Sequence, residues 1–350
     1  MTRTGTTNRA GRAVRLLCLL TVPLLAATAC GASGSPSSPA KSSEATGAAT
    51  EAGPPTVVEM VIFGPPSLGA FLPAVIEARE IDLEHNLDIK FIERPPDAYN
   101  TEFASGQYPL GGSAALLSEG LRQSRGVDVA YLFNIFDFFG AVVSTKPEIK
   151  SLEDLPGHSL AAAASTTNYA MFQWFAQQQG VELKDITVQN TATPGLVTQA
   201  LTGRSDAVQL WEPAYSTMMA KSDDLTTLDL GYEAWEKEFG FSDIPYLGVA
   251  AQRSWIDENE ELIPDLQATY EDAAEWILAN PDEAAKIIAA TIPDGDEAVI
   301  ADLISNNDRL GLNVTSAADL ADAIRSVFEA GVQIDYFEKM PDDRVIYGVD

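Results

Sequence analysis

The chain has 350 residues, with 22 lysines and arginines against 51 aspartates and glutamates, and a formal net charge of −29 at neutral pH. So acidic a chain lacks the clustered basic residues that bind nucleic acid, and anionic lipid headgroups would repel it. Its two histidines, His85 and His158, and its two cysteines, Cys18 and Cys30, supply no cluster with the spacing of zinc ligands. The composition argues against nucleic acid as a partner, and we expect no metal site and no cofactor.

The first 29 residues have the layout of a bacterial lipoprotein signal. Four arginines precede an apolar stretch at residues 16–27, and Ala27-Thr28-Ala29 leads into Cys30. We expect residues 1–29 to be removed and Cys30 to carry lipid, so that the chain works outside the cytoplasm, anchored to the cell membrane. Two alternatives stay open: an ordinary secretory signal, and a membrane-spanning anchor, for which the stretch is short because a span needs about 20 residues.

Residues 30–55 are predicted to be a flexible tether. The segment 31–53 consists almost only of Gly, Ala, Ser, Thr and Pro, a composition that cannot bury apolar surface. A tether directly after a lipid-bearing cysteine would hold a folded domain away from the membrane. Because Cys18 would leave with the signal, the domain has no disulfide and must depend on a hydrophobic core.

From residue 56 onward, apolar strand-like segments alternate with helical ones. Residues 56–63 are β-branched and apolar, which predicts a buried parallel strand, and Gly64-Pro65-Pro66-Ser67 ends it. Further strands are expected at residues 87–93, 110–113, 127–133 and 139–144, with helices at 68–80, 99–105 and up to about 123. This alternation implies βαβ units and a parallel sheet.

A second run of the same kind begins near residue 151. Strands are expected at residues 159–164, 186–189, 207–210, 226–229 and 245–251, with helices at 165–179, 194–202 and 213–221. Helices then dominate, at residues 264–280, 281–291, 296–305 and 317–331. Segments 56–144 and 151–245 therefore predict two α/β lobes, and the helical C-terminal third must pack on one of them.

The loops that follow the predicted strands are the places to look for a binding site, because open α/β sheets bind ligands outside the carboxyl ends of their strands. Five such loops share small hydroxyls, backbone N–H groups and aromatic residues, as small-molecule sites do, together with two carboxylates. The candidate ligand-binding residues are Pro66, Ser67, Gly112, Ser113, Asn134, Asp137, Ser165, Thr166, Thr167, Trp211 and Glu212.

Several of these residues have a purely structural alternative. Residues 165–167 open a helix, where their hydroxyls and N–H groups would either bind an anionic oxygen or simply cap the helix. Trp211 would supply a stacking face, although a tryptophan at a strand end is often part of a core. The phenylalanines at positions 133, 136, 138 and 139 are more typical of a core than of a pocket, which leaves Asn134 and Asp137 as the polar candidates there.

Catalysis finds little support in the sequence. His85 lies in an acidic loop and His158 follows a Pro-Gly turn, and neither adjoins a serine in a nucleophile elbow. No P-loop or G-x-G-x-x-G fingerprint occurs. A lipid-anchored hydrolase acting between the lobes stays as the alternative function, because the many carboxylates leave an acid pair open. An adhesion or scaffold module would instead require a large exposed apolar patch.

Several stretches, in order and spacing, resemble the substrate-binding lipoproteins of ABC importers for nitrate, sulfonates and taurine, also called the NMT1/THI5-like family. Residues 151–157 match the family's entry to its second lobe, and residues 201–207 match its L-x-x-G-x-x-D-A element. Trp211-Glu212-Pro213 matches the W-E-P that follows. Residues 161–168 stand where the family has a ligand loop, and residues 103–112 resemble an earlier glycine element.

This resemblance implies a periplasmic-binding-protein type II fold, with two α/β lobes, two crossovers and a ligand cleft that closes by hinge bending. The first lobe would comprise residues 56–145 and 246–350, and the second residues 146–245, with crossovers near 144–147 and 245–247. A solute-binding protein of this kind is not an enzyme, and its partners would be an ABC permease and an ATPase. We expect a monomer.

The candidate loops contain no lysine or arginine, but they do contain Asp137 and Glu212. A buried carboxylate facing an anionic ligand is costly, which favours a neutral, zwitterionic or heteroaromatic amine ligand, such as a pyrimidine precursor of thiamine, over a sulfonate or nitrate. Arg94, just after a first-lobe strand, would reverse this argument if it reached the cleft. The related enzymes that make the thiamine pyrimidine have a cysteine-rich iron site, and the absence of cysteines after Cys30 argues against that activity.

Overall fold

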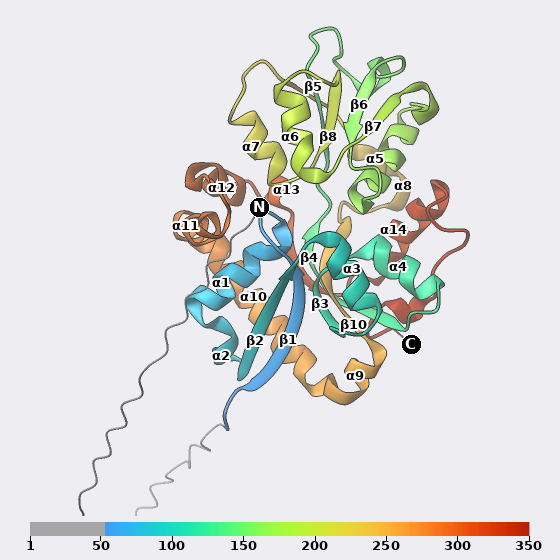
Figure 1. Cartoon of the computed structure of the whole chain (residues 1–350). Coiled ribbons are helices and arrows are strands. Elements are labelled where there is room, and N and C mark those ends of the chain that lie inside the picture. The colour runs from blue at the N-terminus through green and yellow to red at the C-terminus, as the bar shows by residue number, and fades with distance from the viewer. Residues whose placement is uncertain (1–52, 350) are drawn as a thin grey trace, which may run out of the picture. The chain divides into compact units, whose positions relative to one another are not determined.

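The computed structural model describes residues 53–349. The predicted signal at residues 1–29, the predicted lipid site Cys30 and the tether up to residue 52 lie outside these residues. The described chain forms two α/β lobes, each built on its own sheet (Figure 1). The α/β fold class predicted from the sequence is therefore confirmed.

The first lobe is built on a 6-stranded sheet in the order β11-β4-β10-β3-β1-β2. Its strands are β1 (Thr56–Phe63), β2 (Leu87–Arg94), β3 (Leu110–Ala115), β4 (Val129–Asp137), β10 (Pro245–Gln252) and β11 (Leu312–Ser316). β1 runs parallel to β2 and β3, whereas β10 is antiparallel to β3 and β4, and β11 is antiparallel to β4.

Helices from both the early and the late part of the chain surround this sheet (Figure 1). The early ones are η1 (Leu68–Ala70), α1 (Phe71–Arg79), α2 (Ile81–Glu84), α3 (Pro96–Ala104) and α4 (Leu116–Ser124). The late ones are α9 (Arg253–Asn259), η4 (Glu260–Leu262), α10 (Ile263–Ala279), α11 (Pro281–Thr291), α12 (Glu297–Ile304), α13 (Asn307–Leu310), α14 (Ala321–Gln333) and η5 (Asp343–Val345). α1 packs against both α10 and α11, which joins the two ends of the chain in one lobe.

The second lobe is built on a 5-stranded sheet in the order β7-β6-β8-β5-β9. Its strands are β5 (Ala141–Ser144), β6 (Ser159–Ala162), β7 (Thr187–Asn190), β8 (Ala207–Leu210) and β9 (Thr226–Leu228). Its helices are η2 (Leu152–Asp154), α5 (Thr167–Gln178), η3 (Leu183–Asp185), α6 (Thr193–Leu201), α7 (Ala214–Met219) and α8 (Glu233–Phe239). β6 is parallel to β7 and β8, and β5 is antiparallel to β8 and β9.

The expectation of purely parallel sheets is wrong, because both sheets are mixed. β10 returns from the second lobe and enters the middle of the first sheet in the antiparallel sense, between β3 and β4. β11 was not expected at all. Its residues alternate weakly and only Leu312 is fully buried, so the sequence gives little sign of a strand that adds to the sheet edge.

The first crossover between the lobes also lies earlier than expected. β4 ends at Asp137 in the first sheet and β5 begins at Ala141 in the second, so the chain crosses at residues 138–140 rather than near 144–147. Residues 139–144 resemble one apolar strand in the sequence. The backbone of Gly140, however, hydrogen-bonds to a side chain and not to a neighbouring strand. Its N–H donates to the Tyr232 hydroxyl at 2.8 Å, and that hydroxyl donates back to the Gly140 carbonyl at 2.9 Å.

The second crossover precedes β10 and lies beside the first. The N–H of Phe138 donates to the carbonyl of Ile244 at 2.8 Å, which joins the two crossing segments directly. The ring of Phe138 packs against Phe175 and Tyr246, with centroids 5.8 and 5.7 Å apart. Apolar packing is therefore continuous from one lobe to the other at the crossovers.

Among the described residues, no helix is long and apolar enough to span a bilayer.

Gly248 tests the position of β10 in the sheet. A Cβ atom at this residue would lie 2.2 Å from the carbonyl oxygen of Phe133 and 2.3 Å from the hydroxyl of Tyr131. Because the backbone of β4 cannot yield to it, Gly248→Ala should lower the free energy of unfolding by at least about 2 kcal/mol in urea denaturation. In Gly64→Ala the new Cβ would meet Glu93 at an ordinary 3.5 Å, so this control should stay within about 1 kcal/mol of the wild type. Equal stability of both variants would contradict this packing of β10.

Candidate functional site

The structure brings the loop that follows β1 next to Gly112 and Ser113. These two residues lie inside β3 rather than in the loop after a strand that the sequence predicts. Ser67 caps η1, accepting the N–H of Gly69 at 3.2 Å. Ser113 is fully buried, and its Oγ accepts the N–H of Phe63 at 2.9 Å. A Cβ on Gly69 would lie 2.2 Å from Ser113 Oγ, which shows how closely the two segments approach. The Ser113 hydroxyl therefore ties the end of β1 to β3.

The other two candidates in these segments differ in exposure. Pro66 is exposed, beside the partly buried Ser67. Gly112 is buried, and a Cβ there would lie 2.4 Å from the sulfur of Met60. Its backbone is therefore packed against the core rather than open to a ligand, while Pro66 and Ser67 form the accessible part of this edge.

Asn134 and Asp137 lie in one hydrogen-bond network at the carboxyl end of β4. Asp137 accepts the amide N–H groups of Asn134 at 3.1 Å and of Asn313 at 2.9 Å, one on each carboxyl oxygen. The side-chain oxygen Oδ1 of Asn134 accepts hydrogen bonds from the Tyr131 hydroxyl at 2.8 Å and from the backbone N–H of Tyr246 at 3.2 Å. We call these five residues the polar junction. It links β4, β10 and β11 where the two crossovers begin.

The second lobe reaches the polar junction through the start of α5. Thr167 Oγ1 donates to the Tyr246 hydroxyl at 3.3 Å. Thr166 acts as a helix cap, since its Oγ1 accepts the N–H of Tyr169 at 3.2 Å and donates to the carbonyl of Ala163 at 2.8 Å. The capping alternative is thus realised for the Thr166 hydroxyl, while Ser165 is exposed beside it.

Two buried amides next to this helix start were not predicted. Asn168 Nδ2 donates to the carbonyl of Phe139 in the first crossover at 3.1 Å, and Gln209 Nε2 donates to Asn168 Oδ1. Both side chains are fully buried. Asn168 ends the candidate loop 165–168 but is not among the predicted ligand-binding residues, and Gln209 lies inside β8 rather than in a loop. The available signals were a glutamine within the predicted apolar strand 207–210 and a tyrosine, Tyr246, within the predicted strand 245–251.

Trp211 and Glu212 follow β8, on the side of the second lobe that faces α12. Trp211 is partly buried and packs on the apolar cluster beneath α6 and α7. The Glu212 side chain is 1% exposed and accepts the Ser216 hydroxyl at 2.8 Å and the Ser216 N–H at 3.1 Å. Burial raises the pKa of Glu212, which the bonds from Ser216 and the charge of Arg309 oppose and the charge of Asp302 reinforces.

The phenylalanines near β4 are core residues, as expected. Phe133, Phe136 and Phe138 are at most 5% exposed. Phe139 is partly buried, and its ring lies 5.6 Å from that of Tyr215 in α7. The polar character of this part of the chain therefore comes from Asn134 and Asp137.

Burial also perturbs the acid–base equilibrium of the Asp137 carboxyl in the polar junction. Burial raises its pKa from 3.8 to about 7, the bonds from Asn313 and Asn134 oppose the rise, and the charge of Asp243 adds to it. A carboxyl group with such a pKa is largely protonated below neutral pH and can then donate a hydrogen bond. The junction thus offers a proton donor or an acceptor, depending on pH.

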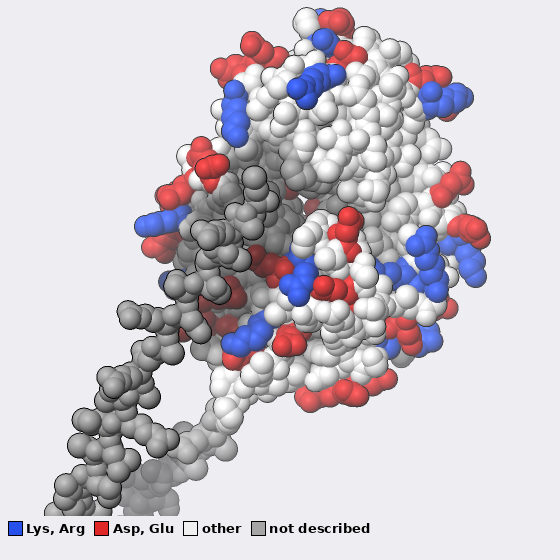
Figure 2. All heavy atoms as spheres, in the orientation of Figure 1, with Lys and Arg blue, Asp and Glu red and all other residues white. Residues whose placement is uncertain are grey.

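The cations nearest to the candidate loops are already paired with acids. Arg94 Nε donates to Glu102 at 2.7 Å, and its Nη2 donates to the Tyr108 hydroxyl at 3.1 Å. Arg309 pairs with Asp302 at 2.6 Å. In Figure 2 charged side chains of both signs are scattered over the visible parts of both lobes, with uncharged surface between them. Because these arginines are already paired with acids, the candidate loops still favour a ligand that is not strongly anionic.

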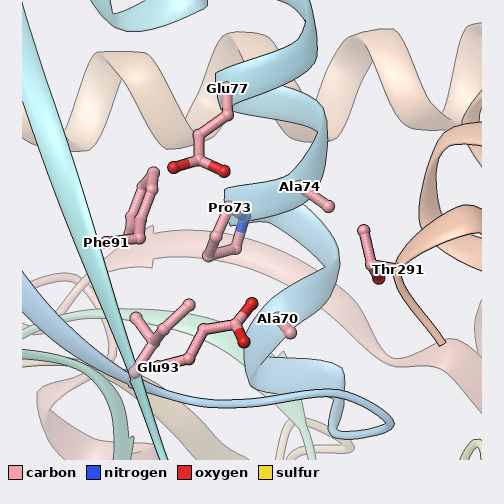
Figure 3. Close-up of a pocket in the computed structure, with 8 residues that line it drawn as sticks. Ala70, Pro73, Ala74, Glu77, Phe91, Glu93 and Thr291 are labelled. Atoms are coloured by element: carbon pink, nitrogen blue, oxygen red, sulfur yellow. The ribbon is translucent and has the colours of Figure 1, made fainter. Parts of the chain in front are cut away.

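Two pockets are found among the described residues, and neither is lined by the predicted ligand-binding residues. One, of about 110 Å³, is small for an organic ligand and lies between α1, β2 and α11. Figure 3 shows Glu77 and Glu93 pointing into it on either side of Pro73. Burial and the charge of Glu93 raise the pKa of Glu77. The other, of about 360 Å³, lies between α2 and α10, at the opposite edge of the sheet from the candidate loops.

Over residues 53–349, no group of three or more His, Cys, Asp or Glu side chains is placed to hold a metal ion.

The sequence itself decides the family. Residues 83–284 match the family described as NMT1/THI5 like. The chain belongs to this family. The match covers both lobes, from the end of α2 to the start of α11, and it confirms the resemblance read from the short motifs. No curated protein matches the sequence.

Solved structures show that this NMT1/THI5-like chain has the fold of periplasmic binding proteins. The aliphatic sulphonate binding protein SsuA of Escherichia coli is 17% identical, with a TM-score of 0.67 over 83% of this chain and 96% of that one. SsuA of Xanthomonas axonopodis, bound to MOPS, is 15% identical, with a TM-score of 0.66 over 85% and 99%. A Candida albicans protein described as having the generic periplasmic binding protein fold is 13% identical, with a TM-score of 0.58 over 83% and 93%.

Asp137 predicts how stability depends on pH. Its pKa is higher in the folded chain than in the unfolded one, so between about pH 4 and pH 7 the native state binds more protons. Stability is therefore lost as pH rises through this range. Between about pH 5 and about pH 8, the free energy of unfolding should fall by roughly 2–3 kcal/mol more for the wild type than for Asp137→Asn. Urea denaturation of both proteins at the two pH values measures this difference. Equal slopes for the two proteins would show that Asp137 ionises normally.

Proposed function

We propose that this protein is an extracytoplasmic solute-binding protein that delivers a small polar organic molecule to an ABC importer. The observation that carries the proposal is the polar junction of the first lobe, which Thr167 of the second lobe contacts at the crossovers, within a chain of the NMT1/THI5-like family. Its partners would be a membrane permease and an ATPase. The likeness to the two SsuA proteins supports this role.

The ligand would lie among the strand-end loops, in contact with side chains from both lobes. We assign ligand contacts to Pro66, Ser67, Asn134, Asp137, Ser165, Thr167 and Trp211. Gly112, Ser113, Thr166 and Glu212 complete the predicted set and support the site through the backbone packing and hydrogen bonds described above. In this arrangement Trp211 offers a flat apolar face and the polar junction offers directional hydrogen bonds.

The chemistry of these residues favours a ligand that is neutral, zwitterionic or a heteroaromatic amine. Asp137 is a carboxyl group, and the nearby Arg94 and Arg309 are held by Glu102 and Asp302. A sulfonate or nitrate would meet the N–H groups at the start of α5 but no unpaired cation among these residues. We therefore place a thiamine-pyrimidine type of ligand ahead of a sulfonate, nitrate or taurine type.

The lipid anchor is a further part of the proposal. Cys30 after a small-residue segment would carry lipid, and the tether that follows would give the binding domain reach toward its permease. The acidity of the chain supports this division of labour, because a domain repelled by anionic headgroups needs a separate anchor.

A thermal-shift screen tests ligand binding. Taurine, an alkanesulfonate, nitrate, bicarbonate, thiamine, pyrimidines and amino acids would each be added to the full chain. A true ligand at 100 times its dissociation constant stabilises the folded state by about 2.7 kcal/mol, without turnover. Consumption of a compound that does not shift the melting temperature would overturn the binding-protein proposal.

Trp211→Ala should abolish the shift given by any compound that stabilises the wild type, because it removes the stacking face, while the fold is kept. Trp276→Ala is the matched control. Trp276 is also partly buried, but it lies on α10 under Arg79, whose guanidinium carbon is 4.7 Å from the ring centroid, away from the candidate loops. The same affinity in both variants would remove Trp211 from the site.

Cys30→Ala tests the anchor. This variant should move from the membrane fraction to the soluble extracytoplasmic fraction and should fail to incorporate a labelled fatty acid. Cys18→Ala, within the predicted signal, should stay with the membrane like the wild type. If Cys30→Ala still incorporates the label, lipid is attached elsewhere.

A further inference from the structure

The two asparagines that bond to Asp137 differ in what fixes the direction of their side-chain amides. The fully buried Asn134 uses all of its hydrogen-bonding capacity. Its Oδ1 accepts from the Tyr131 hydroxyl and from the backbone N–H of Tyr246. Its Nδ2 donates to Asp137 Oδ1 at 3.1 Å and to the backbone carbonyl of Asn313 at 3.0 Å. A backbone N–H only donates and a backbone carbonyl only accepts, so the Asn134 amide cannot be reversed.

The Asn313 amide on β11 has partners that tolerate either direction. Its Nδ2 donates to Asp137 Oδ2 at 2.9 Å, and its Oδ1 accepts the Thr315 hydroxyl at 2.7 Å. A hydroxyl group donates or accepts, and a carboxyl group donates once it is protonated. A reversed Asn313 amide would therefore keep both contacts, with Nδ2 donating to Thr315 Oγ1 and Oδ1 accepting from protonated Asp137.

The fixed Asn134 amide also indicates which oxygen of Asp137 takes up a proton. Oδ1 accepts an N–H that cannot turn away, whereas the donor on Oδ2 belongs to Asn313, which can turn. A proton from the solvent is therefore best placed on Oδ2. With Asn313 in its present direction, this O–H would face an N–H, and two donors form no hydrogen bond.

We infer that Asn313 is a positioning residue for Asp137, and that its amide and the Thr315 hydroxyl reverse together when the carboxylate takes up a proton. No bond between heavy atoms forms or breaks in this change. The inference deepens the proposed function and rests on it for its bearing on a ligand, because Asp137 is assigned there to ligand contact. Asn313 then decides how this carboxyl group is held in each of its charge states.

The groups around Asp137 bring its protonation into the physiological range. Burial and the charge of Asp243, in the second crossover, raise its pKa to about 7 against the opposing amide donors. Tyr131 of β4 and Tyr246 of β10 are neutral phenols whose pKa burial raises further. β11 contributes no titratable side chain. Among the ion pairs of the described residues, none includes Asp137 or Asp243, so amide donors alone stabilise the carboxylate.

Nuclear magnetic resonance of the isotope-labelled full chain, without any ligand, tests the reversal. As the pH falls through the midpoint of the Asp137 carboxyl-carbon titration, the Asn313 side-chain N–H protons should lose their Overhauser contact with the Asp137 methylene. They should gain one with the Thr315 methyl group, while the Asn134 side-chain protons keep their contacts. Asn313 contacts that stay the same on both sides of the midpoint would overturn the inference.

Substitutions on β11 separate a reversing amide from a fixed one through the pKa of Asp137. Asn313→Ala removes an N–H from the carboxylate and should raise this pKa by about one pH unit. Thr315→Val leaves the reversed Nδ2 without an acceptor. Because an unpaired N–H is tolerated less well than an unpaired carbonyl, this variant should lower the pKa by about half a pH unit. Thr315→Ser keeps a hydroxyl and should leave the pKa unchanged. An unchanged pKa in Thr315→Val would show a fixed amide.

Ser316→Ala is the matched control on the same strand. Its hydroxyl bonds to Asp319 at 2.6 Å, outside the polar junction, so the pKa of Asp137 should not move. If Asn313→Ala does not fold, judged by circular dichroism, the nearly isosteric Thr315→Val and the wild-type Overhauser contacts decide the question. Amide reversal in a protein that binds none of the screened compounds keeps this inference and counts against the proposed function. A fixed amide in a protein with a confirmed ligand does the opposite.

Discussion

Where the chain passes between its two sheets, its backbone N–H and C=O groups are not part of either sheet, and they must be hydrogen-bonded elsewhere. The two crossing segments meet this demand together. Phe138 and Ile244 bond to each other, Gly140 bonds to Tyr232, and the N–H of Tyr246 bonds to Asn134. Because Phe138 and Ile244 come from the two crossing segments, each crossover satisfies a backbone group of the other. The convergence of the strand-end loops depends on this pairing.

The same requirement explains why so many polar side chains are buried near the crossovers. Asn134, Asn168 and Gln209 are fully buried, and each amide bonds to another element of the chain. Burial of this kind raises the pKa of the one carboxyl group among them, Asp137. A site built from amides and a carboxyl of raised pKa exchanges hydrogen bonds with a ligand more readily than it neutralises an anionic one.

The alternation of strands and helices was readable from the sequence because buried parallel strands such as β1 are continuous apolar runs. The antiparallel direction of β10 could not be predicted, because an apolar strand has the same residue pattern in either direction. β11 was missed because it is short and half exposed. The motifs identified the family because they combine turn residues with acids in a fixed order.

Part of the candidate site was also predictable. Asn134, Asp137 and Thr167 stand at strand ends, where the position alone indicates a role, and the structure connects them. Tyr246 and Asn313, which complete the network, come from β10 and β11, far along the chain. Only the tertiary arrangement brings these strands to β4, and no local pattern around residue 313 indicates that its amide will reach Asp137.

The proposed site lies where the two lobes meet, and its side chains decide which ligand it favours. At 17% identity, the likeness to a sulphonate-binding protein transfers the architecture and not the contacts. In this chain Arg94 is bound to Glu102, and Arg309 is bound to Asp302 beside Glu212. Both cations that could face an anion thus serve the protein's own acids. In the proposed site, an anionic ligand that used either arginine would have to displace its carboxylate, whereas a neutral or zwitterionic ligand or a heteroaromatic amine would leave both pairs intact.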